Sequence, residues 1–181
     1  MATLRIIHLG NPILRKKSQL VPLEKLKTKS FQLFLDKLAQ TCIKHKGVGI
    51  AAPQTGKNIR VIVVYVDPQN PRYLNKNPFP LTIVINPQVI KQSRREKEDW
   101  EGDLSVNLRG LVSRPVSCVV TGLDREGREI KFELKDDFHA RVFQHEIDHL
   151  DGSMFLDKVE RKESFSTYEM WKKYWKGKKL P

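Results

Sequence analysis

Residues 144–150 read Gln-His-Glu-Ile-Asp-His-Leu, and this stretch decides how the rest of the chain must be arranged. On a helix, positions i and i+4 lie one turn apart on the same face, so His145 and His149 can bind one metal ion. Glu146 would then lie beside the coordination position that a water molecule takes. Two imidazoles and a carboxylate in this order form the minimal set for metal-assisted hydrolysis of an amide.

The helix that carries this motif is predicted to be buried. Asp136 or Asp137 is a suitable N-cap for it. Its apolar residues lie on several sides: Phe138, Ala140, Val142, Phe143, Ile147 and Leu150. A helix that is apolar nearly all round belongs in the middle of a domain. The alternative is a pair of histidines without a metal, but a buried imidazole pair needs polar partners and a metal supplies one.

The remaining elements predict an α+β fold. Residues 28–45 have apolar side chains at three- and four-residue spacing, which is typical of a helix with one buried face. Four segments have the composition of strands: 59–66, 81–86, 117–123 and 129–134, with Pro87 ending the second. Residues 160–176 are expected to form a last amphipathic helix. The order predicts antiparallel sheets around the central helix, with an N-terminal and a C-terminal helix.

The length of 181 residues suggests one domain with a tail. We expect the catalytic domain to cover residues 1–160 and a basic helix or tail to cover 161–181. The two cysteines, Cys42 and Cys118, could pair, but are more often free buried thiols in a reducing compartment. The N-terminus lacks an apolar stretch of secretory length, and no apolar run is long enough to span a membrane. We therefore expect a soluble, cytoplasmic protein, and a monomer.

The net charge of +12 is high for a chain of this size. It is compatible with solubility alone, or with a polyanionic neighbour such as a ribonucleoprotein. Part of the excess is a lysine-rich C-terminal tail that extends to Lys179. No RNA-binding signature accompanies it, so the composition supports direct nucleic-acid function only weakly.

Two further segments carry chemistry. Residues 47–54 read Gly-Val-Gly-Ile-Ala-Ala-Pro-Gln, with small residues where a chain must pass close to a ligand or another backbone. Gln54 ends the segment with an amide that can donate to an oxyanion. Residues 101–106 read Glu-Gly-Asp-Leu-Ser-Val and place a carboxylate, Asp103, beside a backbone N–H. The simpler alternatives are a glycine-ended helix before a plain buried strand, and an ordinary polar loop.

Together the three segments resemble the peptide deformylase family over about residues 4–159. The first is similar to the family's Gly-x-Gly-x-Ala-Ala-x-Gln motif, and the third to its Gln-His-Glu-x-Asp-His-Leu motif. The second is similar to its Glu-Gly-Cys-Leu-Ser motif, with Asp103 in place of the cysteine. The resemblance implies a hydrolase that removes the formyl group from the N-terminal formyl-methionine of nascent polypeptides and releases formate.

The resemblance also implies roles for individual residues. The metal ligands would be Asp103, His145 and His149, holding one divalent ion, with Fe²⁺ expected and Zn²⁺, Ni²⁺ or Co²⁺ as alternatives. Glu146 would exchange the protons, while the Gln54 amide and the Leu104 N–H would meet the oxyanion. The substrate would be bound by Val48, Gly49, Arg109, Phe138 and Val142, with the ring of His145 beside them. Asp148 and Arg114 would orient the ligands.

Asp103 keeps the charge of a thiolate but replaces soft sulfur with hard oxygen, so metal preference, affinity and rate should shift. The chain also looks one residue short after Val106, where Asn107 stands alone. Besides an active deformylase, two alternatives stay open. One is a catalytically impaired binding module at the ribosome or nascent chain, and the other is a metallohydrolase of a different N-acyl peptide.

Overall fold

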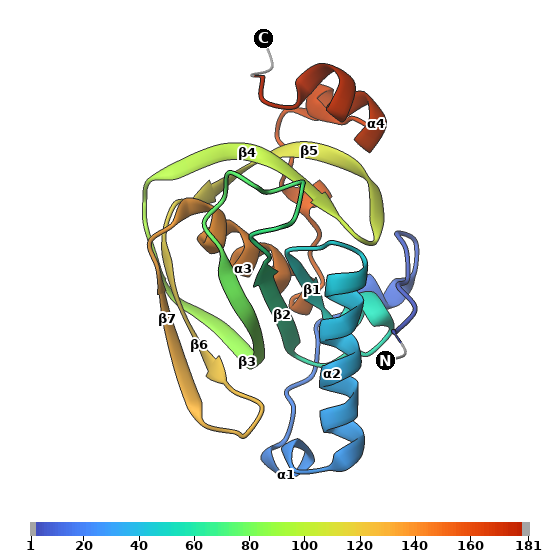
Figure 1. The fold of residues 1–181 in the computed structure, drawn as a ribbon, viewed down its shortest axis with the longest axis vertical. Coiled ribbons are helices and arrows are strands. Elements are labelled where there is room, and N and C mark those ends of the chain that lie inside the picture. Colours follow the sequence, from blue (N-terminus) through green and yellow to red (C-terminus); the bar gives the residue numbers. More distant parts are fainter. Residues whose placement is uncertain (1–2, 179–181) are drawn as a thin grey trace.

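The computed structural model of the chain describes residues 3–178, and it shows an α+β architecture (Figure 1). The strands are β1 Gly49–Ala51, β2 Val61–Val66, β3 Phe79–Gln92, β4 Glu96–Asp103, β5 Val106–Pro115, β6 Cys118–Leu123 and β7 Glu129–Leu134. The α-helices are α1 Leu23–Leu26, α2 Lys29–Lys44, α3 Asp137–Leu150 and α4 Tyr168–Met170. The expected fold class is therefore confirmed, including a helix near each end of the chain.

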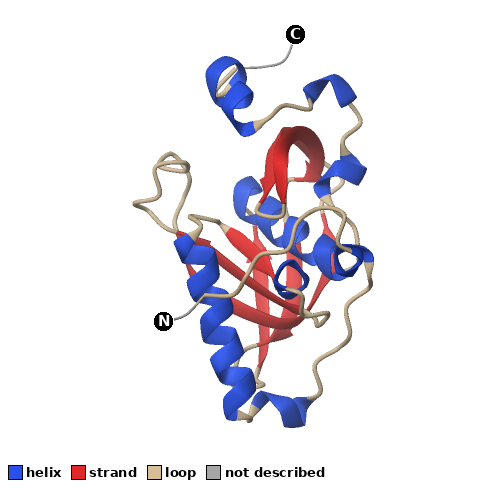
Figure 2. Ribbon diagram, turned by 90° about the vertical axis from the view of Figure 1, so that its right-hand side faces the viewer, coloured by secondary structure: helices blue, strands red, loops and turns tan. Residues whose placement is uncertain are grey.

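Five strands form one antiparallel sheet in the order β1-β2-β3-β6-β7, and β4 and β5 form a separate antiparallel hairpin. Successive side chains of strand β2 point to opposite faces of the sheet, and both faces are buried. Ile62 and Val64 belong to the core that includes α3, whereas Val61 and Val63 belong to the core that includes α2. Figure 2 shows α2 lying alongside the strands, with the C-terminal helical turns beyond the hairpin.

Helix α3 lies between the sheet and the β4–β5 hairpin, as its all-round apolar pattern predicts (Figure 1). Phe143 and Leu150 have no exposed surface. The helix begins after Asp136, which accepts hydrogen bonds from the backbone N–H groups of Phe138 and His139, each 3.0 Å long. Of the two aspartates proposed as N-cap, Asp136 takes the position. The central helix can therefore present both histidines to the neighbouring β4–β5 hairpin.

Two expectations about element boundaries are wrong. Strand β3 does not end at Pro87 but continues to Gln92. The proline is tolerated because the register shifts between Ile85 and Gln88, and a bulge requires no ladder hydrogen bond from the missing N–H. Asn86 accommodates the bend with a φ of 52° and fixes it through side-chain hydrogen bonds to both backbone groups of Val21.

The C-terminal helix is also shorter than expected. It covers α4 and a following π-helical turn, Trp171–Trp175, rather than residues 160–176. The preceding segment instead forms a short 3₁₀ turn and pairs with strand β5 through Ser166. Lys179 of the basic tail lies outside the described residues. Both cysteines are free and buried, as expected. Within residues 3–178, no helix is long and apolar enough to cross a bilayer.

The Asp136 cap generates a stability prediction. Replacing Asp136 with alanine removes the acceptor for two helix N–H groups, and we expect a loss of about 1–2 kcal/mol in the free energy of unfolding. Asp136→Asn keeps the acceptor oxygen and should lose clearly less. Urea unfolding followed by circular dichroism measures both values. Equal losses in the two variants would show that the cap hydrogen bonds are not the source of the stabilisation.

Candidate metal centre

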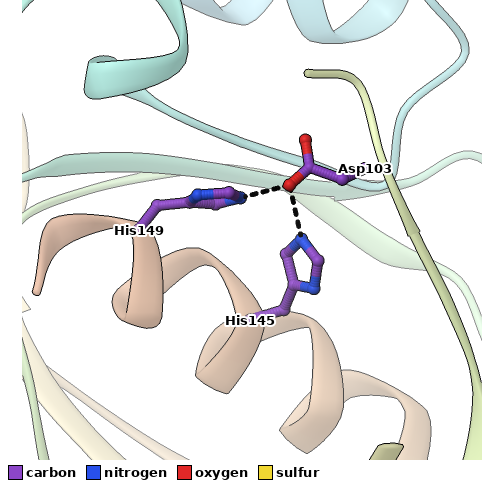
Figure 3. A group of neighbouring side chains, drawn as sticks. All are labelled: Asp103, His145 and His149. Atoms are coloured by element: carbon purple, nitrogen blue, oxygen red, sulfur yellow. Dashed lines mark ion pairs between the residues drawn. The ribbon is translucent and has the colours of Figure 1, made fainter. Parts of the chain in front are cut away.

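Helix α3 and the end of strand β4 bring three donor side chains together. Asp103 Oδ2 lies 3.0 Å from His149 Nε2 and 3.8 Å from His145 Nε2 (Figure 3). The two histidines are one helical turn apart, with ring centroids separated by 5.0 Å. The three donor atoms lie within 4.8 Å of one another. The helix and the hairpin therefore bring the three donor atoms to one point.

The two oxygens of Asp103 have different surroundings. Oδ1 accepts a hydrogen bond from the Gln54 side-chain amide at 2.8 Å and another from the Ser105 backbone N–H at 2.6 Å. Oδ2 is buried and has no hydrogen-bond partner, as is also true of both ring nitrogens of His149. Burial by itself raises the pKa of Asp103, but the neighbouring His149 outweighs it and lowers the pKa to about 2. One oxygen holds the side chain in place, and the other faces the imidazoles.

This cluster fits a divalent cation. Ligand atoms about 2.1 Å from one tetrahedral ion lie roughly 3.4 Å apart, and the two distances from Asp103 Oδ2 bracket that value. Buried polar atoms without a partner are costly, and a shared cation would satisfy both Asp103 Oδ2 and His149 Nε2 at once. Two imidazoles and a carboxylate are a donor set that proteins use for zinc and ferrous iron.

Glu101 fixes the orientation of His145. Its Oε2 accepts a hydrogen bond of 2.9 Å from His145 Nδ1, which leaves Nε2 pointing toward Asp103. Burial lowers the pKa of His145, but the Glu101 carboxylate outweighs it and raises the pKa to about 9. Glu101 therefore favours positive charge on that ring, and a cation replacing the proton on Nε2 would gain from the same carboxylate.

Two arginines complete this network. Arg114 donates to both oxygens of Glu101, at 2.6 and 2.9 Å, and Arg141 donates to Oε1 at 2.6 Å. Burial raises the pKa of Glu101, but these donors and His145 hold it well below its usual range. The carboxylate thus stays charged, and its stabilising contribution disappears only in strong acid. The remaining guanidinium nitrogen of Arg114, Nη1, donates to Asp148 at 2.8 Å.

Glu146 packs directly against the glycine-rich segment. A Cβ atom built on Gly49 would lie 2.3 Å from Glu146 Oε1. The backbone therefore lies so close to the carboxylate that only glycine fits at position 49. Only 4 % of Glu146 is exposed, and Oε2 has no hydrogen-bond partner. Burial raises the pKa of this carboxyl group to about 7. The small residues that the sequence places at 47–52 therefore make room for an acid–base group.

A cleft of about 690 Å³, part of which is open to solvent, lies above these residues. It brings together nine predicted site residues besides Asp103: Val48, Gly49, Gln54, Leu104, Arg109, Phe138, Val142, His145 and Glu146. His149 is not part of the lining, because it is only 1 % exposed and lies beneath the cleft. The roles of these residues remain predictions, but all of them converge on one place.

Sequence reasoning missed Glu101 and Arg141. Asp148 is predicted to orient a ligand, but its side chain accepts hydrogen bonds from Arg114 and Lys158 rather than from a histidine. Glu101 contacts His145 instead. A signal was present, because Glu101 and Asp103 are two residues apart on a strand and so can share a face. Nothing in the sequence indicates Arg141, whose role depends on how the hairpin packs on α3.

The fold and the site together define a hydrolase of the His-Glu-x-x-His type with a buried cluster suited to a metal. Comparison with known proteins makes the class specific. The family model described as polypeptide deformylase matches residues 3–165. The chain therefore belongs to the polypeptide deformylase family, a metal-dependent family that removes the formyl group from N-terminal formyl-methionine of nascent polypeptides.

Individual relatives agree with this assignment. The chain is 45% identical over 158 residues to peptide deformylase 2 of a Nostoc species, covering 87% of this chain and 86% of that protein. A class I type b peptide deformylase from Acinetobacter baumannii, with Met-Ala-Ser bound, matches with a TM-score of 0.83 and 32% identity, covering 87% and 99%. A probable peptide deformylase from a Synechococcus phage matches with a TM-score of 0.75 and 35% identity, covering 87% and 100%.

The Glu101 network generates a second stability prediction. Arg114→Met leaves a buried carboxylate short of two hydrogen bonds, and we expect a loss of about 3–5 kcal/mol in unfolding free energy. The matched control is Arg128→Met, which removes an arginine from exposed ion pairs with Asp124 and Glu126 and should have no measurable effect. Urea unfolding measures both. Similar small changes in the two variants would contradict a structural role for the Arg114–Glu101 pair.

Proposed function

We propose that the chain is an active deformylase whose divalent ion is held by Asp103, His145 and His149. The observation that carries this proposal is the convergence of unpartnered donor atoms from Asp103 and His149 at the floor of the cleft that Glu146 lines. A bound ion would polarise the formyl carbonyl and make a water molecule nucleophilic at neutral pH.

Glu146 is placed to exchange the protons of the reaction. Its carboxylate is held against Gly49 and lines the cleft beside His145. It would take a proton as the formyl carbon is attacked and later give that proton to the amine that leaves. The close approach of Gly49 limits the positions that the carboxylate can occupy, which favours a fixed distance to the reacting atoms.

Gln54 and Leu104 would meet the negative charge that develops on the formyl oxygen. The Gln54 side chain is fixed at both ends, since its oxygen accepts from the Ala51 N–H at 2.7 Å and its nitrogen donates to Asp103. An amide nitrogen has two hydrogens, so one remains for the substrate. Removing one such donor typically costs about 3–4 kcal/mol of transition-state stabilisation.

The methionine side chain would occupy the apolar part of the cleft. Val48, Phe138 and Val142 line it, together with the ring of His145. Gly49 would let the substrate backbone lie close to β1, and Arg109 would lie near the residues that follow. This arrangement would select an unbranched apolar side chain. It would also present the formyl amide of that methionine to Glu146.

The identity of the ion and the cellular setting are further parts of the proposal. The resemblance favours Fe²⁺, with Zn²⁺, Co²⁺ or Ni²⁺ as alternatives. Compared with a thiolate, the hard oxygen of Asp103 shifts the preference of the site toward harder ions. We also propose that the protein acts in the cytoplasm as a monomer. The basic C-terminal segment would bring it close to ribosomal RNA.

Glu146→Gln provides the first functional prediction. The variant keeps the shape of the side chain but cannot take a proton, so formate release from formyl-Met-Ala-Ser should fall by about 10²–10⁴-fold. Metal content, measured by mass spectrometry, should stay unchanged because Glu146 is not a ligand. Activity within tenfold of the unaltered protein would exclude Glu146 as the proton carrier.

Asp103→Cys provides the second. Cysteine supplies a soft thiolate and releases the Gln54 amide from its hydrogen bond with Asp103, so we expect about tenfold or greater gain in kcat and a shift of bound metal toward softer ions. Asp103→Asn is the control, since it keeps the shape, loses the charge and should lose metal. A cysteine variant with metal bound but no gain in kcat would show that Asp103 does not limit the reaction.

A further inference from the structure

The cleft carries positive charge that takes no part in the proton transfers described above. Lys46, Arg72 and Arg109 line the cleft, and we call these three side chains the cationic rim. Lys46 and Arg72 are exposed and Arg109 is half-buried. Across residues 3–178, none of the three forms an ion pair with an acidic side chain. The rim therefore presents cations without counter-charges to anything that enters.

The two arginines of the rim are held by aromatic rings. Tyr168 lies between them, with Arg72 Cζ 5.3 Å and Arg109 Cζ 5.4 Å from the ring centroid. Arg109 Cζ also lies 4.6 Å from the ring of Trp171. A guanidinium against an aromatic face is stabilised without losing its hydrogen-bond donors, which stay available at the edge of the group. These contacts pre-order the arginines for an anionic partner.

The C-terminal segment that supplies these rings is fixed to the hairpin by its backbone. The Arg109 N–H donates to the Ser166 carbonyl at 2.7 Å, and the Ser166 N–H donates to the Arg109 carbonyl at 3.0 Å. Trp171 packs edge-on against Trp100 of β4, with centroids 6.4 Å apart. Figure 1 shows the segment lying over the β4–β5 hairpin. The rim is thus a built feature of this chain rather than a set of loose side chains.

Gly102 sets the direction of Arg109. A Cβ atom at Gly102 would lie 2.8 Å from Arg109 Cζ, so the guanidinium rests on the bare backbone of β4 next to Asp103. Arg72 and Arg109 line the same cleft as Glu146, so a peptide whose formyl group is at Glu146 would extend along a wall that these two side chains form. The residues just after methionine would therefore pass within reach of the rim, since each extended residue adds about 3.3 Å.

We propose that the cationic rim selects formyl peptides that carry an acidic side chain at the second or third residue. This inference rests on the proposed function, because it assumes that formyl-methionine occupies the inner cleft. A carboxylate there would meet two pre-ordered guanidinium groups and the Lys46 ammonium. The acidic groups on the floor of the cleft would not oppose it strongly, since Glu101 is compensated by its arginines and Asp103 faces two histidines.

The test compares formyl-Met-Ala-Glu amide with formyl-Met-Ala-Gln amide, since the amide removes the terminal carboxylate. We expect kcat/KM for formate release to be about fivefold higher for the glutamate peptide at low salt, through KM. The ratio should approach 1 near 0.5 M salt, where screening is strong. Arg72→Gln should at least halve the low-salt ratio. Arg128→Gln removes an exposed cation from the β6–β7 turn and should change neither the ratio nor the rate.

A second pair of variants tests the aromatic support. Tyr168→Leu removes the aromatic support of Arg72 and one of the two rings against Arg109, so it should lower the glutamate-to-glutamine ratio. Tyr168→Phe keeps the ring face and should preserve the ratio. A merely structural role for Tyr168 would change both peptides equally and would leave the ratio intact, and that result would overturn the positioning role.

Binding of N-acetyl-Met-Ala-Glu amide and its glutamine analogue, followed by tryptophan fluorescence, separates the two proposals. Equal binding of the two N-acetyl peptides, together with equal formate release from the two formyl peptides, would overturn the rim while the deformylase function stands. Tighter binding of the N-acetyl glutamate peptide, with no formate released from either formyl peptide, would support the rim and contradict the function. Equal peptide binding, with displacement of both by a ten-nucleotide RNA, would make the rim a nucleic-acid surface and would also overturn the proposal.

Discussion

The buried carboxylate of Glu101 is the interaction on which the site depends. It comes from strand β4, takes two hydrogen bonds from Arg114 on β5, and takes one each from Arg141 and His145 on α3. A charge in this position is tolerated only because it is fully compensated. The same four bonds fasten the hairpin to the central helix, so they fix the position of Asp103 relative to the histidines.

Asp103 shows how a carboxylate can take the place of a smaller ligand. Its two oxygens make different contacts. Oδ1 accepts hydrogen bonds from Gln54 and the Ser105 backbone, while Oδ2 faces the imidazoles. A thiolate has a single donor atom and would leave the Gln54 amide free. The substitution therefore changes more than the hardness of the ligand, since it ties the proposed oxyanion donor to the metal cluster.

Much of this arrangement could be predicted from the sequence, where local pattern and tertiary structure agree. The helix at 29–44, the β6–β7 hairpin and the buried α3 follow from periodicity and turn residues. The continuation of β3 through Pro87 could not, because it depends on a bulge that Asn86 stabilises by contacts with Val21. The role of Arg141 was equally hidden, since it arises from packing between the hairpin and α3, which are distant in sequence.

The double burial of strand β2 has a consequence for folding. One of its faces is covered by α2, which precedes it closely, and the other by α3, which follows more than seventy residues later. Contacts of such long sequence separation form slowly, because the entropy of closing a large loop is lost before the contacts can stabilise the chain. The early half of the molecule can collapse around α2 while the second face of β2 still lacks its cover. We therefore expect the three donor side chains to assemble late, so that a competent centre would mark a chain that has completed its topology.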